Sequence, residues 1–373
     1  MRVGIDVSSV VYGTGVSDYT LELVRHLEHL GGGRKDSPEV KVVPVGFSLR
    51  RQADLKRLIP ACAVYPLPPT ALHYLWNKFH VLNFENFAPG RIDVYHSSDW
   101  AQAPDSHPKV TTVHDLAPLL YPAETTQGLI RNIVSTHTAR LHWVTAECDR
   151  IICVSRSTES DLIHLFPKTK GRTTVIPEAL PSRFNLQPTS EGAKGRHNSQ
   201  PYLLAIGARQ PRKNVARLIS AFTRFRSRYR LPDQLVIVGE ATHPRGGVAP
   251  AAHPGGETEV KFTGYLTDQE LVNYLAGASA FVFPSLHEGF GLPILGAFHH
   301  RVPVAASDIP VFRETAGPAA KFFDPLNEES IAKGIASTIK DRSHLTRLGI
   351  TQLTKFSWTK TAQQTLKVYQ SLC

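Results

Sequence analysis

The sequence lacks the features of a secreted, membrane-spanning or disulfide-stabilised protein. Its 373 residues include only four cysteines, which are scattered and form neither a CxxC pair nor a metal-ligand spacing. No apolar run approaches the roughly 20 residues that a transmembrane helix needs. The opening MRVGIDVSSVVYG has neither the charged region nor the apolar block of a signal peptide. We therefore expect a cytoplasmic protein with reduced thiols.

Several sequence motifs are also missing. No Asp-x-Asp pair occurs, so we expect no metal ion. The net charge is +10, but no zinc-finger or RNA-recognition motif accompanies it, so we expect no nucleic acid partner. An anionic membrane surface or a phosphorylated small molecule remains as an explanation of the charge. The turn Gly13-Thr-Gly15 lacks the full GxGxxG pattern, which makes a nicotinamide-dependent dehydrogenase the least favoured function.

The chain is rich enough in apolar residues, at 42%, to form two α/β domains. Short apolar runs alternate with helical periodicity, which predicts mostly parallel sheets covered on both faces. A strand, a glycine turn and a helix open the chain, and the same order returns at Tyr202. A polar, aperiodic stretch at 186–200 separates the halves. We predict two doubly wound, Rossmann-like domains that face each other across a cleft.

Polar residues at the carboxyl ends of predicted strands mark the candidate site, because ligands of open α/β sheets bind there. His114 and Asp115 follow the buried run 110–113. In the loop after the strand at 202–207, Arg209, Arg212 and Lys213 gather before a helix, which favours an anion site over a solvated loop.

The segment SLHEGFGLPILG, residues 285–296, follows another buried strand. Gly289 and Gly291 allow main-chain amides to approach a ligand closely, and a helix that begins near Leu292 directs its positive end there. Glu288 repels a phosphate, so we expect it to accept hydrogen bonds from sugar hydroxyls. The loop is therefore predicted to hold both a phosphate and a polyol.

The ordered motifs VYGTGVSDYT, VHDLAPLLYP, YLLAIGARQPRKN, FVFPSLHEGFGLPILGA and the closing FSWTKTAQQTLKVY resemble glycosyltransferase family 4, whose members are retaining, nucleotide-sugar-dependent enzymes with the GT-B fold. The resemblance runs over nearly the whole chain, and its mannosyltransferase-like members match best. It implies an N-terminal acceptor domain (1–190), a C-terminal donor domain (200–355) and a final helix (356–373) that returns to the first domain.

On the donor sugar, the resemblance implies two main contacts. His114 matches the family histidine that lies near the reacting centre, and Glu288 matches the first acid of the E-x7-E motif, which holds sugar hydroxyls. Gly13 and Gly15 match the glycine loop beside the donor phosphates and the acceptor.

On the diphosphate, the resemblance implies a basic clamp of Lys213 with Arg212 or Arg209. The main-chain amides that face the phosphate or the sugar belong to Gly289, Phe290, Gly291 and Leu292.

Three positions depart from the family pattern. The second acid of E-x7-E, which usually holds the ribose, is Gly296 here, and this puts nucleotide affinity in question. Ala208 replaces a frequent arginine, for which Arg209 is able to compensate. The turn that usually follows the helix of this motif is replaced by His-His-Arg at 299–301. The simplest explanation of these residues is that cations are favoured at the C-terminal end of a helix.

We expect a retaining hexosyltransferase that needs neither metal nor cofactor and transfers a hexose, with mannose favoured, from a nucleoside-diphosphate sugar to a glycan or lipid-linked acceptor. Two alternatives stay open: a catalytically impaired binding protein, indicated by Gly296, and a sugar-nucleotide epimerase of the same fold. Basic and aromatic residues between Arg50 and Phe87 fit both a patch that contacts the inner face of the membrane and ordinary core helices.

Overall fold

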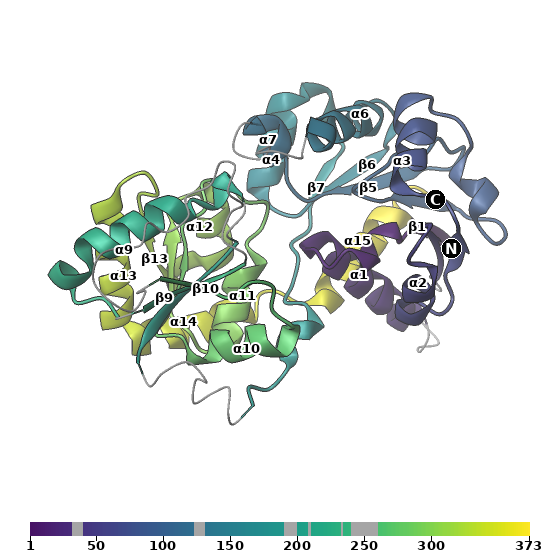
Figure 1. Ribbon diagram of the computed structural model, residues 1–373. Coiled ribbons are helices and arrows are strands. Elements are labelled where there is room, and N and C mark those ends of the chain that lie inside the picture. Colours follow the sequence, from purple (N-terminus) through teal and green to yellow (C-terminus); the bar gives the residue numbers. More distant parts are fainter. Residues whose placement is uncertain (32–39, 123–130, 190–199, 208–209, 233, 240–259) are drawn as a thin grey trace. The chain divides into compact units, whose positions relative to one another are not determined.

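The computed structural model describes residues 1–31, 40–122, 131–189, 200–207, 210–232, 234–239 and 260–373, and divides into two compact units (Figure 1). The first unit contains Met1–Leu120, Ile130–Pro181 and Phe356–Cys373. The second contains Tyr121–Leu129 and Ser182–Lys355. The boundary at Pro181 lies before the predicted end of the first domain at 190, and the predicted linker begins inside the second unit.

A seven-stranded parallel sheet forms the centre of the first unit, in the order β3-β2-β1-β4-β5-β6-β7. Its strands are β1 (Arg2–Asp6), β2 (Lys41–Phe47), β3 (Ala63–Tyr65), β4 (Val94–Ser97), β5 (Lys109–Val113), β6 (Arg150–Cys153) and β7 (Thr173–Val175). Its α-helices are α1 (Gly15–Gly31), α2 (Gln52–Leu58), α3 (Pro69–Leu72), α4 (Ala117–Leu120), α6 (Arg131–Glu147), α7 (Arg156–Leu165) and α15 (Trp358–Gln370).

Both faces of this sheet are buried, which explains why its strands are apolar runs rather than alternating patterns. Neighbouring residues of β2 belong to opposite cores: Val42 packs with α1 and α15, whereas Val43 packs with Trp76 and Phe84. Helices α1 and α15 lie side by side (Figure 1) although they come from the two ends of the chain.

The second unit has a six-stranded parallel sheet in the order β10-β9-β8-β11-β12-β13. Its strands are β8 (Tyr202–Ile206), β9 (Gln234–Val238), β10 (Val260–Phe262), β11 (Ala280–Phe283), β12 (Val304–Ser307) and β13 (Ala320–Phe323). Its α-helices are α9 (Val215–Tyr229), α10 (Asp268–Gly277), α11 (Leu292–His299), α12 (Pro310–Ala316), α13 (Glu328–Lys340) and α14 (Arg342–Leu353). A capping box of Thr267 and Glu270 opens α10.

In each sheet the connections run outward in two directions from one pair of neighbouring strands. This switch point lies between β1 and β4 in the first unit and between β8 and β11 in the second. Loops that leave the carboxyl ends of such a pair diverge, and the space that they leave is the usual ligand site of a doubly wound sheet. Functional residues are therefore expected at the two switch points.

Candidate functional site

Two loops meet at the switch point of the second unit. One follows β8 and forms a short 3₁₀ turn at Pro211–Lys213; the other follows β11 and leads into α11. The loops are joined by a main-chain hydrogen bond from Leu286 N to Arg212 O of 2.8 Å. Because β8 and β11 are hydrogen-bonded neighbours, groups some 75 residues apart in sequence come together here.

The charged groups of these loops form one buried cluster. The Nζ of Lys213 lies 2.5 Å from Oε1 of Glu288, and Nη1 of Arg212 lies 3.0 Å from Oε2. The exposed fractions of the three side chains are 17, 11 and 10% for Lys213, Arg212 and Glu288. Burial opposes ionisation of Glu288, but the charges of Lys213 and Arg212 outweigh it and lower the pKa of the carboxyl to about 2. The acid and the cations that the sequence analysis treats as separate groups are thus paired.

The backbone around Lys213 is shaped to accommodate its side chain. Gly207 has a φ of 103°, and a Cβ there would lie 3.0 Å from Cγ of Lys213. Asn214, which follows in a left-handed conformation, donates from Nδ2 to Pro284 O and Pro325 O. The loop is therefore fixed by the Asn214 side chain as well as by the ion pairs. Arg209, the third predicted cation, lies outside the described residues.

The glycine turn of the β11 loop also has a structural basis. Gly291 has a φ of 98°, and a Cβ there would lie 3.2 Å from the ring of Phe312. The Phe290 side chain is buried, and its carbonyl accepts from Thr315 Oγ1 at 2.6 Å. The ring of Phe290 therefore belongs to the core of the second unit and is not offered to a ligand. Leu292 begins α11; the next residue, Pro293, has no amide hydrogen, and the amide of Ile294 donates to Gly291 O at 2.9 Å.

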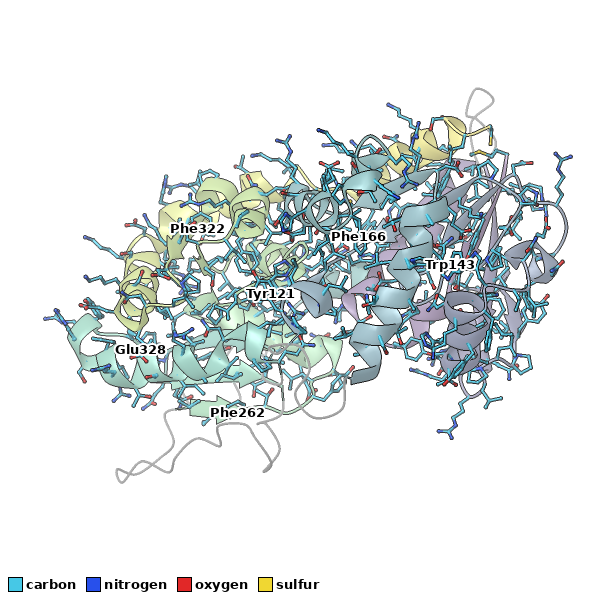
Figure 2. All side chains as sticks on the ribbon, turned by 90° about the horizontal axis from the view of Figure 1, so that it is seen from above. Tyr121, Trp143, Phe166, Phe262, Phe322 and Glu328 are labelled. Atoms are coloured by element: carbon cyan, nitrogen blue, oxygen red, sulfur yellow. The ribbon has the colours of Figure 1, made fainter. Side chains whose placement is uncertain are left out.

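A phenylalanine ring occupies the space beside Gly296. A Cβ at this position would lie 2.8 Å from Cε1 of Phe184, whose side chain is buried. The missing second acid of the E-x7-E pattern is thus replaced by close packing of an aromatic ring on the helix. Gly296 is recognisable from the sequence, but Phe184, whose ring occupies the space beside it, is not. The ring of Tyr121 (labelled in Figure 2) lies 5.1 Å from that of His287, the residue before Glu288.

In the first unit, His114 follows β5 and pairs with an acid that the sequence analysis missed. Its Nδ1 lies 2.8 Å from Oε1 of Glu178, which follows β7, and both side chains are largely buried. Burial lowers the pKa of His114, but the hydrogen bond and charge of Glu178 raise it by more, so that the net shift is upward. The ring of Tyr19 approaches that of His114 edge-on at 4.6 Å. A polar residue after a predicted strand is the signal that could have identified Glu178.

The remaining predicted positions of the first unit lie in turns. Gly13 has a φ of 67°, and a Cβ there would meet no atom within contact distance, whereas Gly15 begins α1. Both are exposed, as expected of a loop that contacts a ligand. Asp115 accepts from the amide of Ala117 at 3.2 Å and so supports the start of α4.

One group of side chains in the described part of the chain has the geometry to hold a metal ion: Glu85, Asp105 and His107. The two oxygens of Asp105 already accept hydrogen bonds from the amides of Glu85 and His107, and Oδ1 also contacts the His107 ring at 2.7 Å. These bonds give the group a structural explanation.

Comparisons with known structures define the fold. Its fold matches sucrose-phosphate synthase (tll1590) from Thermosynechococcus elongatus with a TM-score of 0.73 and 19% identity, over 100% of this chain and 99% of that one. It matches Anabaena Alr3699/HepE in complex with UDP with a TM-score of 0.67 and 15% identity, over 100% of both chains. The fold is GT-B, the two-domain architecture of many glycosyltransferases.

Two family models then identify the chain. "Glycosyltransferase Family 4" matches residues 13–181 and "Glycosyl transferases group 1" matches residues 187–352. The chain belongs to this family of glycosyltransferases. It is 28% identical to O-antigen chain mannosyltransferase B of Escherichia coli over 75% of this chain and 74% of the relative. It is also 28% identical to the serotype-specific mannosyltransferase WbdA of Escherichia coli over 57% of this chain, but it spans only 28% of that longer protein.

No helix in the described parts of the chain combines the length and the apolar composition that a membrane span requires.

Proposed function

We propose that the protein is a retaining hexosyltransferase that transfers mannose from a nucleoside-diphosphate sugar to a glycan or lipid-linked acceptor. The observation that carries the proposal is the buried cluster of Lys213, Arg212 and Glu288 beside the glycine turn. Cations and main-chain amides suit a diphosphate, and a carboxylate suits sugar hydroxyls. The mannosyltransferase names of the curated relatives favour mannose.

Donor binding would exchange partners within the cluster. A diphosphate offers Lys213 and Arg212 more negative charge than one carboxylate does, so the cations turn to the phosphate. Glu288, whose pKa the two cations hold at about 2 in the free protein, is then available to the sugar hydroxyls. Arg209 belongs to the same proposed clamp. As the glycosidic bond stretches, negative charge grows on the departing diphosphate, and these fixed cations stabilise it.

The same residues also favour a reaction that retains the anomeric configuration and needs no metal ion. The charges of Lys213 and Arg212 supply the neutralisation that a divalent cation provides in other transferases. Glu288 is committed to hydroxyl binding, so we do not assign it as a nucleophile. We therefore propose attack from the face of the leaving group, with the phosphate taking the proton of the acceptor hydroxyl. His114 would contact the transferred sugar near the reacting carbon.

A panel of UDP-, GDP-, ADP- and dTDP-sugars tests the proposal. We expect one donor class to raise the melting temperature and to release its nucleoside diphosphate when a mannose-containing acceptor is added. EDTA should leave the rate unchanged, and NMR should show the anomeric configuration retained. Binding without release would favour the impaired binding protein that the Phe184–Gly296 packing suggests. Conversion of the donor without any acceptor would favour an epimerase.

We also propose peripheral contact with an anionic membrane, at the inner face if the protein is cytoplasmic. The structure does not favour the predicted basic residues, since Arg51 and Arg57 both pair with Asp54 and Lys56 donates to Cys62 O. A better candidate is the apolar cluster of the segment 74–82. Its exposed large side chains, with exposed fractions of 47 to 69%, are Tyr74, Phe79, Val81 and Leu82.

The apolar cluster is presented by a rigid support. Trp76 is fully buried and donates to Leu82 O at 2.9 Å, while His80 stacks at 3.7 Å on Trp143, which Figure 2 labels. Aromatic side chains with a nearby lysine, here Lys78, suit a lipid headgroup region. In liposome flotation with anionic lipid, the double change Tyr74→Ser and Phe79→Ser should abolish binding. Neutralising Arg51 and Arg57 should have little effect, and equal flotation of all variants would refute the contact.

A further inference from the structure

A small cavity lies at the switch point of the first unit. It measures about 20 Å³, enough for one water molecule or one hydroxyl group. Residues from the ends of three neighbouring strands line it, together with four residues of α1. The lining residues that matter here are Asp6, Tyr19, His96, Ser98, Asp99 and His114. The cavity thus connects a predicted catalytic residue with an acid that neither the sequence analysis nor the family motifs single out.

Asp6 ends β1 and uses only one of its two oxygens within the protein. Its Oδ1 accepts from the amide of Ser8 at 2.9 Å and from the Ser8 hydroxyl at 2.5 Å. Its Oδ2 is buried, and among the described residues no donor meets hydrogen-bond geometry with it; the Ser98 hydroxyl is near enough to favour the charged form, but burial outweighs it and raises the pKa of Asp6. The side chain is only 1% exposed. A buried carboxylate oxygen without a donor is costly, so the position needs an explanation.

The nearby cation Arg140 is not the missing partner of Asp6 Oδ2. The buried guanidinium of Arg140 is directed to other groups: to Ser98 O at 3.0 Å, to Asp99 Oδ1 at 3.3 Å and to Thr111 Oγ1 at 2.6 Å. The turn at Ser8 does not require a carboxylate either, because an asparagine oxygen would accept the same two bonds. Compared with an asparagine, a carboxylate at this position has a second acceptor oxygen, Oδ2, and this oxygen lines the cavity.

We propose that Oδ2 of Asp6 accepts a hydrogen bond from one hydroxyl of the sugar acceptor, which enters the cavity beside His114. The ligand is a neutral polyol and not a phosphate, because the acids Asp6 and Asp99 both line the cavity and would repel an anion. This inference rests on the proposed function and adds the residue that orients the acceptor. It also explains why β1 ends in an acid at the switch point, where ligand groups are expected.

The change Asp6→Asn tests the proposal, because it keeps the acceptor for Ser8 and replaces Oδ2 by a donor. Binding is measured by saturation-transfer NMR and calorimetry with methyl glycosides of mannose, glucose, galactose and N-acetylglucosamine. We expect wild-type protein to bind at least one of them and Asp6→Asn to bind it about ten- to a hundredfold more weakly. The melting temperature of Asp6→Asn should be equal to or above that of wild type, since an unsatisfied buried charge is removed.

Asp105→Asn is the matched control. Asp105 is also a buried carboxylate, but both of its oxygens have donors within the protein. This variant should lose stability and keep its affinity for the glycoside, the opposite of Asp6→Asn.

Equal glycoside affinity of wild type and Asp6→Asn, or no binding of any glycoside by wild type, would overturn the inference. Failure of the proposed function gives a different result. In that case the wild type releases no nucleoside diphosphate from any donor, while the loss of glycoside binding in Asp6→Asn still supports the acceptor site.

Discussion

Lys213 is the residue whose charge the proposed reaction uses most directly. Its ammonium group lies within a largely buried cluster, and the backbone at Gly207 is shaped around its side chain. We expect Lys213→Ala to lower kcat by about 10²-fold or more, as losses of transition-state charge stabilisation do. The measurement is nucleoside diphosphate release at saturating donor. Lys333→Ala, which removes an exposed lysine paired with Glu329, is the control and should retain full activity.

The fold of Lys213→Ala should persist, because Arg212 still pairs with Glu288 and Asn214 still fixes the loop. Circular dichroism and thermal melting check this point. A variant that is folded and turns over at the wild-type rate would remove Lys213 from the mechanism.

Glu178 controls the charge of His114, and this gives the protein a predictable pH dependence. The pKa of His114 is raised in the folded state, so the pair stabilises the fold fully below the ordinary histidine pKa of about 6.5. That stability is lost as the pH rises through the raised, folded value. We expect Glu178→Gln to lower the free energy of unfolding by about 1.5–3 kcal/mol at pH 5.5 and by much less at pH 9. Urea denaturation at the two pH values measures the difference.

An NMR titration of His114 provides the second readout, and Glu178→Gln should move its pKa downward. The half-buried acid Glu329 gives a control: it pairs with Tyr229, Arg228 and Lys333 rather than with a histidine, so any loss of stability in Glu329→Gln should be the same at both pH values. A destabilisation by Glu178→Gln that is as large at pH 9 as at pH 5.5 would show that Glu178 acts through packing and not through the charge of His114.

At the level of single residues, the sequence predicts the site groups but not their partners. His114, Lys213 and Glu288 are recognisable because each directly follows a strand or its loop, where ligands bind. The partner of His114 lies 64 residues away and the partner of Lys213 lies 75 residues away. Which side chains meet across such separations depends on strand order, and no local pattern encodes it. The unused oxygen of Asp6 is likewise visible only once its neighbours are placed.

Among the elements, α11 and the 3₁₀ turn at Ser182–Asn185 are linked through Gly296 and Phe184. Gly296→Glu places side-chain atoms against the Phe184 ring and should cost about 1–3 kcal/mol or more of unfolding free energy. Phe184→Ala should cost about 3–5 kcal/mol through the cavity that it leaves. In the double variant the new side chain has room, so we expect a total cost below the sum of the two, measured by urea denaturation.

Phe79→Ala offers a control for this cycle, because Phe79 is an exposed ring of the first unit. The small loss of unfolding free energy in Phe79→Ala should be additive with the loss in Gly296→Glu. If the losses of stability in Gly296→Glu and Phe184→Ala were also additive, the Phe184 ring would not occupy the space beside Gly296.

The central strands of both sheets are predicted from sequence, whereas two edge strands are missed. Strand β5 is a run of residues buried on both faces, and such runs are conspicuous. Strands β3 and β13 are edges of only three and four residues, and each contains partly exposed positions. Short edge strands have neither a long apolar run nor a clear alternation, so their pairing is decided by the neighbouring strand.

On the scale of the whole molecule, the last helix is structurally part of the first unit. Trp358 and Tyr369 belong to the same core as residues of β1 and α1. Trp358 donates to Leu180 O at 2.9 Å, and the Tyr369 hydroxyl contacts His96 at 2.6 Å. The chain therefore completes its N-terminal unit only when its last residues are in place.

Deletion of residues 356–373 should consequently destabilise the first unit, although most of that unit is far from these residues in sequence. It exposes the apolar face of α1 and leaves His96 without a partner at Nδ1, so we expect the first unit to lose most of its protection in hydrogen exchange. Helices α9 and α13, whose shared core contains no residue of α15, should remain protected. Peptides from α1 and from α9 report the two units separately within one experiment. Uniform loss of protection in both would mean that the units unfold together, and unchanged protection of α1 would mean that α15 contributes little to its core.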